Sequence, residues 1–508
     1  MKKKYLQFFT IAFLFNTCIN RGIYAQANDA RLKNIEATFP VIDEIFSSYA
    51  RQNHFPGFVY GLVVDGKLIH TGSIGYTNVS QKNLADSKSE FRIASMTKSF
   101  TAMAILKLRD EGKLKLDDPV SLYIPEMKGQ KYLTTDATAV TIRNLLTHGA
   151  GFPEDNPWGD RQLAKTDTEL IAMIKNGLSF SNNPGAKYEY SNMGFAMLGY
   201  IIKKVSGMSY EIYITKNILE TLGMMHTYWE YSKVPANELA HGYRWLNEQW
   251  IEQPLLHDGT YGAMGGMITS IEDFSKYVSL QLSAWPPRND ADNGPIKRSS
   301  LREMQFPWNI SGLNAVYKYP GGRPCPLVTA YAYGLRWSKD CEGRVDLGHS
   351  GGLPGFGSNW KIMPDYSIGI ISFSNLTYAP ASLINTQVLD TLIAIAKLQP
   401  RQLPASAILN QRKDELINLL PEWKHPEATH IFAENFFMDY FPDSLRKEAI
   451  TLFNKAGKII QINELIPENN LRGSFIMKGE NNDIEISFTL TPENPPLIQE
   501  YHIKERNK

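Results

Sequence analysis

Residues 346–356 of this 508-residue chain read Asp-Leu-Gly-His-Ser-Gly-Gly-Leu-Pro-Gly-Phe. Within them, residues 348–352 match G-x-S-x-G, a pattern that places a serine on a sharp turn between a strand and a helix. If Ser350 is that serine, a helix has to begin there. If it is not, another residue carries the chemistry, so this stretch decides the fold.

The sequence after Ser350 excludes that helix. Four glycines and one proline follow it at Gly351, Gly352, Pro354, Gly355 and Gly357. Each glycine costs a helix about 1 kcal/mol and an interior proline about 3 kcal/mol. The turn would also need a histidine later in the main domain, and the remaining ones are His425, His430 and His502. We therefore expect the stretch to be a strand at the edge of a cleft.

A better nucleophile is Ser95 in the pattern Ser95-x-x-Lys98. Residues 100–111 have helical periodicity and Gly112 is a plausible stop. At the start of that helix the two side chains lie one turn apart on the same face. A sheltered lysine can lose its proton and act as the base for the serine. By itself the pattern is weak, because a helix cap followed by a solvated lysine looks the same.

Two further elements can complete the site. Tyr190 can relay a proton and Asn192 can donate and accept through its amide, although a buried loop tyrosine is the alternative. On the predicted strand, alternation points His349 and Gly351 to one face. Gly351 would then give a substrate backbone room to approach, and the edge that contains Ser350 and Gly351 would bind it. The N–H groups of Ser95 and Gly352 would form a two-donor oxyanion hole.

The predicted fold is α+β, an antiparallel sheet flanked by helices. Residues 57–71 indicate a hairpin around Asp65-Gly66, and residues 359–373 indicate another. Helical segments fill the region between them. We assign residues 28–397 to this domain, 398–415 to a linker and 416–508 to a small α+β domain with a helix at 443–455 and a strand meander.

Residues 1–27 predict a signal peptide, with Lys2–Lys4, an apolar run and Ala25-Gln-Ala27. An uncleaved anchor is the alternative. We expect a periplasmic or secreted protein without stable membrane insertion after cleavage. A net charge of +1 gives no indication of a nucleic-acid partner. Cys325 and Cys341 fit a disulfide or two free thiols equally well. No Cys/His cluster supports a metal.

The three motifs, in this order, resemble the serine β-lactamase/penicillin-binding-protein superfamily, and in particular its class C-like branch, over residues 35–395. Supporting stretches are 91–102, 141–152, 188–202, 261–277 and 333–337. The resemblance implies an additional all-helical subdomain and no cofactor. It also implies Ser95 as nucleophile, Lys98 as base, Tyr190 and Asn192 as the second motif and His349-Ser350-Gly351 as the third.

The third motif departs from the lysine that β-lactamases usually have there. A histidine is mostly neutral at pH 7, so His349 should bind a substrate carboxylate more weakly. Among relatives, a histidine here is common in hydrolases that are not efficient β-lactamases. The alternative is a sheet histidine with satisfied hydrogen bonds. His148 is expected to be structural, in a turn that Gly149 and Gly151 permit.

We therefore expect an exported serine hydrolase that cleaves an amide or ester through an acyl-enzyme. Its small-molecule or peptide substrate would be a D-amino-acid peptide, a peptidoglycan fragment or a small ester. A true β-lactamase and a non-catalytic penicillin- or peptidoglycan-binding sensor are the alternatives. The sequence does not indicate a partner for the C-terminal domain.

Overall fold

The computed structural model describes residues 29–506, so the predicted signal peptide lies outside the described residues. In the described part of the chain, two compact units divide between Gln399 and Pro400. Each has its own hydrophobic core.

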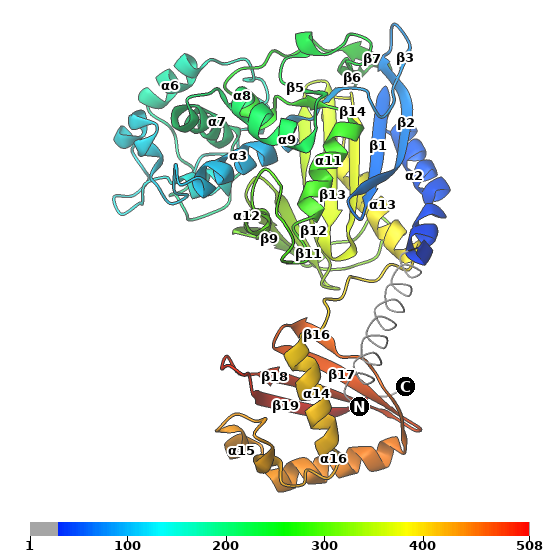
Figure 1. Cartoon of the computed structure of the whole chain (residues 1–508). Helices are drawn as coiled ribbons and strands as arrows, with labels where there is room; N and C mark the ends of the chain where they lie inside the picture. The colour runs from blue at the N-terminus through cyan, green and yellow to red at the C-terminus, as the bar shows by residue number, and fades with distance from the viewer. Residues whose placement is uncertain (1–28, 507–508) are drawn as a thin grey trace, which may run out of the picture. The chain divides into compact units, whose positions relative to one another are not determined.

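A nine-stranded antiparallel sheet forms the centre of the first unit (Figure 1). In spatial order its strands are β3 (Asn83–Leu84), β2 (Lys67–Asn78), β1 (Gly57–Val64), β14 (Ile368–Ser374), β13 (Phe356–Met363), β12 (Val345–Leu353), β11 (Arg336–Asp340), β10 (Leu327–Tyr331) and β9 (Asn309–Asn314). Both predicted hairpins are confirmed as β1–β2 and β13–β14. The sheet also pairs the first long strand with the last, with Phe58 opposite Ser374.

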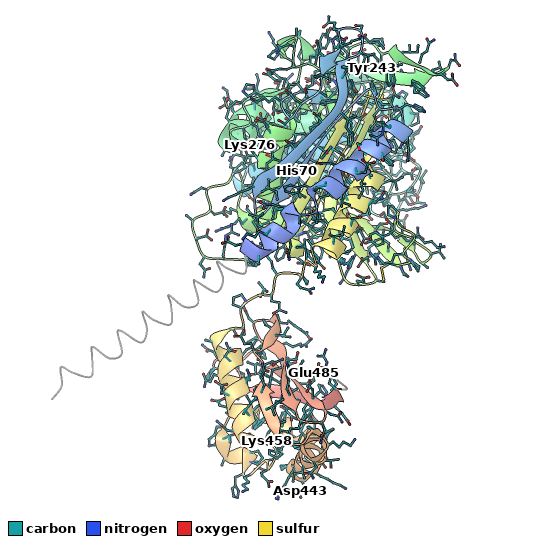
Figure 2. All side chains as sticks on the ribbon, turned by 90° about the vertical axis from the view of Figure 1, so that its right-hand side faces the viewer. His70, Tyr243, Lys276, Asp443, Lys458 and Glu485 are labelled. Carbon is teal, nitrogen blue, oxygen red and sulfur yellow. A yellow bond between two sulfur atoms is a disulfide. The ribbon has the colours of Figure 1, made fainter. Side chains whose placement is uncertain are left out.

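Helices cover both faces of this sheet because its central strands are apolar on both sides. Along β1, Phe58 and Leu62 join the core beneath α2 (Phe39–Gln52) and α13 (Ala381–Ile395). Val59 and Val63 join the core on the opposite face, where α11 (Ile271–Leu282) packs. Figure 2 shows α2 and α13 side by side on their face of the sheet.

A helical subdomain is inserted between β4 (Phe91–Arg92) and β5 (Thr227–Tyr228). Its helices are α3 (Lys98–Asp110), α4 (Ile142–Leu146), α5 (Asn156–Gly159), α6 (Asp167–Lys175), α7 (Asn192–Ser206), α8 (Tyr210–Ile214) and α9 (Glu220–Leu222). The predicted helix at 100–111 is confirmed as α3, and Gly112 follows it with a φ of +72°. Helix α3 packs against α7 at the centre of the subdomain.

Short elements return the chain to the sheet. They are β6 (Tyr243–Leu246), β7 (Gln249–Glu252), α10 (Gly262–Gly265), β8 (Ile268–Thr269) and α12 (Arg298–Met304). Strand β8 pairs with both β4 and β5, so the two ends of the inserted subdomain meet at one strand.

The C-terminal unit is an α+β domain, as expected. Its helices are α14 (Ala407–Leu419), α15 (Phe436–Asp439) and α16 (Pro442–Ala456), and its antiparallel strands are β15 (Ile459–Ile462), β16 (Ile466–Asn469), β17 (Arg472–Gly479), β18 (Asp483–Leu490) and β19 (Ile498–Arg506). Residues 407–415, which the sequence analysis placed in a linker, form most of α14. Leu409 is buried in this unit's core, so the linker is shorter than 398–415.

A disulfide between Cys325 and Cys341 closes the β10–β11 hairpin, which settles the choice that the sequence left open. The two residues lie 16 positions apart, and Cys325 is fully buried. A covalent link across a loop of this length reduces the entropy of the unfolded chain.

We predict that loss of this disulfide lowers the unfolding free energy by about 2–4 kcal/mol. The measurement is thermal unfolding with and without dithiothreitol. Reductant should lower the Tm of the wild type and leave that of a C325A/C341A double variant unchanged. A wild type whose Tm does not respond to complete reduction would contradict the prediction.

Candidate active site

Ser95 and Lys98 meet at the junction of a short 3₁₀ turn, η1 (Ala94–Thr97), with α3. The Lys98 Nζ lies 2.9 Å from the Ser95 Oγ. The serine is 6% exposed and the lysine is fully buried. The residue before the serine, Ala94, has a φ of +50°, which is uncommon for a residue with a side chain. A constrained turn therefore holds the serine at the cleft, and the Lys98 amine is in hydrogen-bond contact with its hydroxyl.

Three protein groups surround the Lys98 amine. Besides Ser95, it donates to the Asn192 Oδ1 at 2.7 Å and to the Met264 carbonyl at 2.8 Å. Burial lowers the pKa of Lys98 to about 7, while the carboxylates of Asp160 and Asp155 oppose that shift. A lysine with this pKa is partly neutral near pH 7, and a neutral amine can accept the serine proton.

Tyr190 and Asn192 both lie at this amine, as the sequence predicted. The Lys98 Nζ is 5.0 Å from the centre of the Tyr190 ring. The Tyr190 phenol is hydrogen-bonded to Ser95, and burial raises its pKa above the usual value. The tyrosine is therefore a neutral phenol at pH 7, so Lys98 is the group able to take the first proton and Tyr190 is able to pass one on.

Two carboxylates that the sequence analysis missed support the second motif. Asp155 accepts from the backbone N–H of Asn192 at 2.6 Å and of Met193 at 2.9 Å, at the N-terminus of α7. Such a carboxylate satisfies N–H groups that a helix leaves unpaired. Asp160 lies 3.5 Å from the Asn192 Nδ2, and burial raises its pKa to about 6.

The Met264 carbonyl is in place because α10 packs unusually close to its neighbours. A Cβ at Gly199 of α7 would lie 2.5 Å from the Ala263 Cβ. The hydroxyl of Thr101 donates to the Ala263 carbonyl at 2.7 Å. This explains why the stretch 261–277 is rich in small residues, a feature that supported the resemblance without indicating a role.

Strand β12 runs past η1 with one edge free. Strand β11 pairs with β12 only between Val345 and Gly348, so within the described residues 349–353 have no strand partner on that edge. An edge of this kind can pair with an extended substrate. The oxyanion hole formed by the N–H groups of Ser95 and Gly352 stays a prediction.

Gly351 needs a correction. A Cβ at this position would lie 2.2 Å from the Ile93 carbonyl oxygen and 3.0 Å from the Ala94 Cβ. The space that the glycine leaves is therefore filled by the turn that carries Ser95. Gly351 lets β12 approach η1 and does not make room for a substrate backbone.

His349 does not reach outward to a ligand. It is 1% exposed, its Nδ1 lies 2.6 Å from the Ser350 carbonyl and its Nε2 lies 2.8 Å from the Tyr331 hydroxyl. A carbonyl only accepts, so Nδ1 carries the proton and Nε2 accepts from Tyr331. Burial, with Arg336 and Lys98 nearby, holds the pKa of His349 well below its usual value. The predicted direct catalytic role is therefore replaced by a neutral, structural one beside Tyr190.

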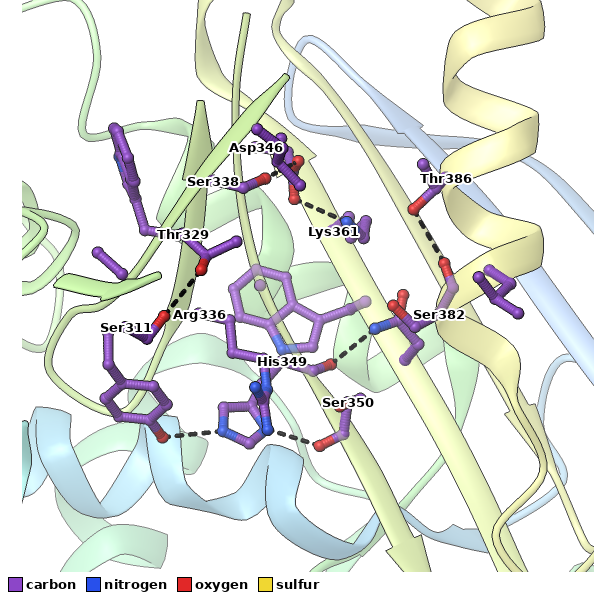
Figure 3. Close-up of a pocket in the computed structure, with 18 of the residues that line it drawn as sticks. Ser311, Thr329, Arg336, Ser338, Asp346, His349, Ser350, Lys361, Ser382 and Thr386 are labelled. Carbon is purple, nitrogen blue, oxygen red and sulfur yellow. Dashed lines mark hydrogen bonds and ion pairs between the residues drawn. The ribbon is translucent and has the colours of Figure 1, made fainter. Parts of the chain in front are cut away.

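Ser350 points to the other face of the sheet. It pairs with Asn359, whose side chain bonds to Asn385 of α13. There it lines a cavity of about 320 Å³ between α13 and strands β9 to β13 (Figure 3). Its predicted contact with substrate therefore depends on whether ligands enter that cavity.

Arg336 supplies the cation that the third motif lacks. Its guanidinium lies 5.4 Å from the centre of the Tyr190 ring, and its side chain is exposed. Among residues 29–506, no Asp or Glu lies close enough to form an ion pair with it, but Tyr188 shares a hydrogen bond with it, and Glu154 and Glu189 line the cavity in front of Tyr190 together with it. Arg336 and Tyr188 line both the 320 Å³ cavity and a second one of about 440 Å³ in front of Tyr190. An accessible, unpaired arginine is suited to a carboxylate.

His148 has the structural position that the sequence predicted. Its φ is +54°, and its Nδ1 accepts from the Ser191 N–H at 3.1 Å. A Cβ at Gly151, which has a φ of +82°, would lie 2.2 Å from the Asn182 carbonyl oxygen. The turn therefore holds the segment of Tyr190 and Asn192 in place through the hydrogen bond between His148 and the Ser191 N–H. In the described part of the chain, no three His, Cys, Asp or Glu side chains form a group able to hold a metal ion.

Comparison with known proteins agrees with this geometry. The Beta-lactamase family matches residues 42–393. Protein flp of Staphylococcus aureus is 30% identical over 380 residues, which cover 74% of this chain and 70% of that protein. Beta-lactamase-like protein 2 of Dictyostelium discoideum is 27% identical over 404 residues, covering 76% and 69%.

Solved structures share the fold. A class C β-lactamase superposes with a TM-score of 0.54 at 22% identity, covering 70% of this chain and 96% of that one. An octameric penicillin-binding protein homologue from Pyrococcus abyssi gives a TM-score of 0.57 at 24% identity, covering 92% and 95%. The family match, the identity to its relatives and the Ser95–Lys98 contact lead to one conclusion: this chain belongs to the Beta-lactamase family of serine hydrolases.

Proposed function

We propose that this protein is an exported serine hydrolase that cleaves an amide or ester bond through a Ser95 acyl-enzyme. The observation that carries the proposal is the 2.9 Å contact between the Ser95 Oγ and a buried lysine whose pKa is about 7. A buried amine beside a serine turns a weak nucleophile into an effective one at neutral pH.

The residues suggest a sequence of proton transfers. Ser95 attacks the carbonyl carbon as its proton passes to the neutral amine of Lys98. The tetrahedral oxyanion is stabilised by the N–H groups of Ser95 and Gly352. Tyr190 gives its proton to the leaving nitrogen or oxygen and regains one from Lys98, which releases the first product. Water then attacks the acyl-enzyme, and its proton passes through Tyr190 to Lys98. Lys98 returns a proton to the Ser95 Oγ as the bond to the acyl group breaks, which regenerates the free serine.

Arg336 favours a substrate with a carboxylate close to the scissile bond. Its guanidinium is accessible beside Tyr190, the proposed proton donor to the leaving group. A peptide that ends in a D-amino acid, or a peptidoglycan fragment, presents a carboxylate on that side. A small neutral ester would use the serine and the oxyanion hole and leave Arg336 unused.

The same cation supports a second candidate, a true β-lactamase. A penicillin also carries a carboxylate near its scissile amide. The sequence argument against β-lactam binding rested on His349 being neutral, and Arg336 provides a permanent positive charge nearby. Turnover of nitrocefin compared with turnover of a D-Ala-D-Ala peptide distinguishes the two candidates.

Export rests on the sequence signal at 1–27. Among residues 29–506, the structure contains no helix with the length and apolar character needed to cross a membrane.

We predict that Ser95→Ala lowers kcat/KM by at least about a thousandfold, because the nucleophile is lost. The assay is a panel of p-nitrophenyl esters, peptides ending in D-Ala-D-Ala and nitrocefin. Ser99→Ala is the matched control, because Ser99 is buried one turn further along α3 and its side chain bonds to the Met96 carbonyl and to Tyr277, away from the Lys98 amine. Turnover by Ser95→Ala at the wild-type rate on every substrate would overturn the proposal.

The panel also separates an enzyme from a sensor. Fluorescent penicillin should label Ser95, and the label should be lost as the acyl-enzyme hydrolyses. A stable adduct, together with no turnover of any panel member, would instead identify a non-catalytic binding protein on this fold.

We predict that kcat/KM rises as the pH increases through about 7, because Lys98 has to be neutral to accept the serine proton. Asp160→Asn removes an anion that holds a proton on Lys98, so the rise should move to lower pH. Asp155 and Arg336 also act on Lys98 and remain in this variant. Glu220→Gln, an exposed change on α9, is the control. An unshifted profile in Asp160→Asn would contradict this assignment.

We predict that Arg336→Gln removes the preference for a free carboxylate. The ratio of kcat/KM for a D-Ala-D-Ala peptide to that for its C-terminal amide should fall by about 10- to 100-fold, since a charge-assisted hydrogen bond is lost. Lys339→Gln, an exposed change on the same strand, should keep the wild-type ratio. A ratio near one in the wild type would show that Arg336 does not bind the carboxylate.

A further inference from the structure

Tyr378 joins the sheet to the helical subdomain across the cleft. It lies in the loop between β14 and α13, and its hydroxyl donates to the Asp160 Oδ2 at 3.2 Å. Asp160 follows α5 in the helical subdomain and is buried, whereas Tyr378 is 45% exposed. The tyrosine side chain can therefore turn away from Asp160 without opening a hydrophobic core. A single hydrogen bond of an accessible side chain closes the cleft at this point.

The backbone of this loop is fixed, although the side chain is accessible. Tyr378 has a φ of +53°, a conformation that is uncommon for a residue with a side chain. Its N–H donates to the Phe356 carbonyl at 3.1 Å, and the Gly355 N–H donates to the Thr377 hydroxyl at 2.7 Å. Residues held in such a conformation cluster at ligand clamps and active sites. These contacts place the Tyr378 ring beside the β12–β13 turn.

The ring of Tyr378 packs against the proposed oxyanion donor. A Cβ at Gly352 would lie 2.8 Å from the Tyr378 Cδ1. At its other end the side chain reaches Asp160, which lies 3.5 Å from the Asn192 Nδ2. Because Tyr190 is the proposed proton donor to the leaving group, the acyl group extends toward the Asn192 side. Tyr378 therefore stands where the acyl group has to pass.

We propose that Tyr378 is the specificity-determining residue for the acyl group. With the hydrogen bond to Asp160 in place, the ring limits the acyl group to a short one, such as acetyl or D-alanyl. A bulkier acyl group binds only after the side chain has turned away, so part of its binding free energy is used to break that hydrogen bond. This proposal rests on the proposed function of Ser95, because it requires an acyl-enzyme.

The same hydrogen bond connects Tyr378 to the catalytic base. A donor to Asp160 stabilises its anion and lowers its pKa, and the Asp160 anion in turn raises the pKa of Lys98. Loss of the hydroxyl therefore lowers the pH at which Lys98 becomes neutral. The other charged or titratable groups that act on Asp160, Tyr378 or Lys98 stay in place when only the hydroxyl is removed: Asp155, Arg161, Arg244, Arg336, Tyr190, His148 and His349.

The test keeps the leaving group constant and varies the acyl group. The substrates are p-nitrophenyl acetate, butyrate and phenylacetate, and each kcat/KM is divided by the rate of spontaneous hydrolysis of the same ester. For the purified wild-type protein, the corrected value should be at least about tenfold higher for acetate than for phenylacetate, the discrimination expected of a steric limit. Butyrate should fall between them.

Two variants separate the ring from its hydroxyl. Tyr378→Asn introduces a small side chain that tolerates a positive φ, and it should raise the value for phenylacetate at least about tenfold while changing that for acetate less than about threefold. Tyr378→Phe keeps the ring and loses the hydrogen bond, so the gain on phenylacetate should be about three- to tenfold. In Tyr378→Phe the rise of kcat/KM with pH should also move to lower pH, in the same direction as in Asp160→Asn.

Lys82→Asn is the matched control. It changes an exposed residue that also has a positive φ, +55°, in the turn between β2 and β3. This variant should keep both the acyl preference and the pH profile of the wild type.

The possible failures are distinguishable. A Tyr378→Asn variant with the acyl preference of the wild type would overturn the role of Tyr378 and leave the Ser95 hydrolase in place. An unshifted pH profile in Tyr378→Phe would overturn the connection to Lys98. If the wild type turns over no ester, peptide or β-lactam, the proposed function fails and this inference fails with it.

Discussion

A lysine with no access to solvent is the constraint on which the rest of the site depends. An ammonium group taken out of water is costly unless it finds hydrogen-bond partners. Lys98 finds them on three separate elements: Ser95 in η1, Asn192 at the start of α7 and the Met264 carbonyl in α10. The partners are sufficient to keep the amine in place and insufficient to keep it fully protonated, since burial lowers its pKa to about 7. Packing of three elements thus sets the chemistry of one amine.

The sheet places strand β12 beside the catalytic serine, but the positive charge of the site comes from a different strand. His349 stands where β-lactamases usually have a lysine, and both of its nitrogens are engaged within the protein. The cation is Arg336, at the first residue of the neighbouring strand. Because the charge lies on the neighbouring strand, it stands over the Tyr190 ring and lines both the cavity on the α13 face and the cavity in front of Tyr190.

Sequence reasoning succeeded where the decisive contacts are local. Ser95 and Lys98 are three positions apart at a helix start, so their meeting follows from helix geometry alone. It failed where the contacts join distant segments. Nothing near Met264 shows that its carbonyl faces Lys98, and Gly351 owes its identity to Ile93, far away in the chain. The linker was predicted to be too long because α14 has few buried residues and so a weak helical pattern. The reason for Leu409 is visible only in the folded C-terminal unit, where it packs into the core.

The two sides of the cleft differ in charge and in space, and that difference is the basis for orienting a substrate. On the Asn192 side lie the buried carboxyl groups of Asp155 and Asp160, and the Tyr378–Asp160 hydrogen bond joins the helical subdomain to the sheet. On the Tyr190 side lies an accessible arginine with open volume beyond it. Under the proposed function, Arg336 would attract an anionic leaving group to the second side, where Glu154 and Glu189 also line the cavity, and Asp155 and Asp160 would repel it from the first side. The acyl group of the proposed acyl-enzyme would then take the Asn192 side, so the charges on either side of Lys98 would help to set the direction in which a substrate binds.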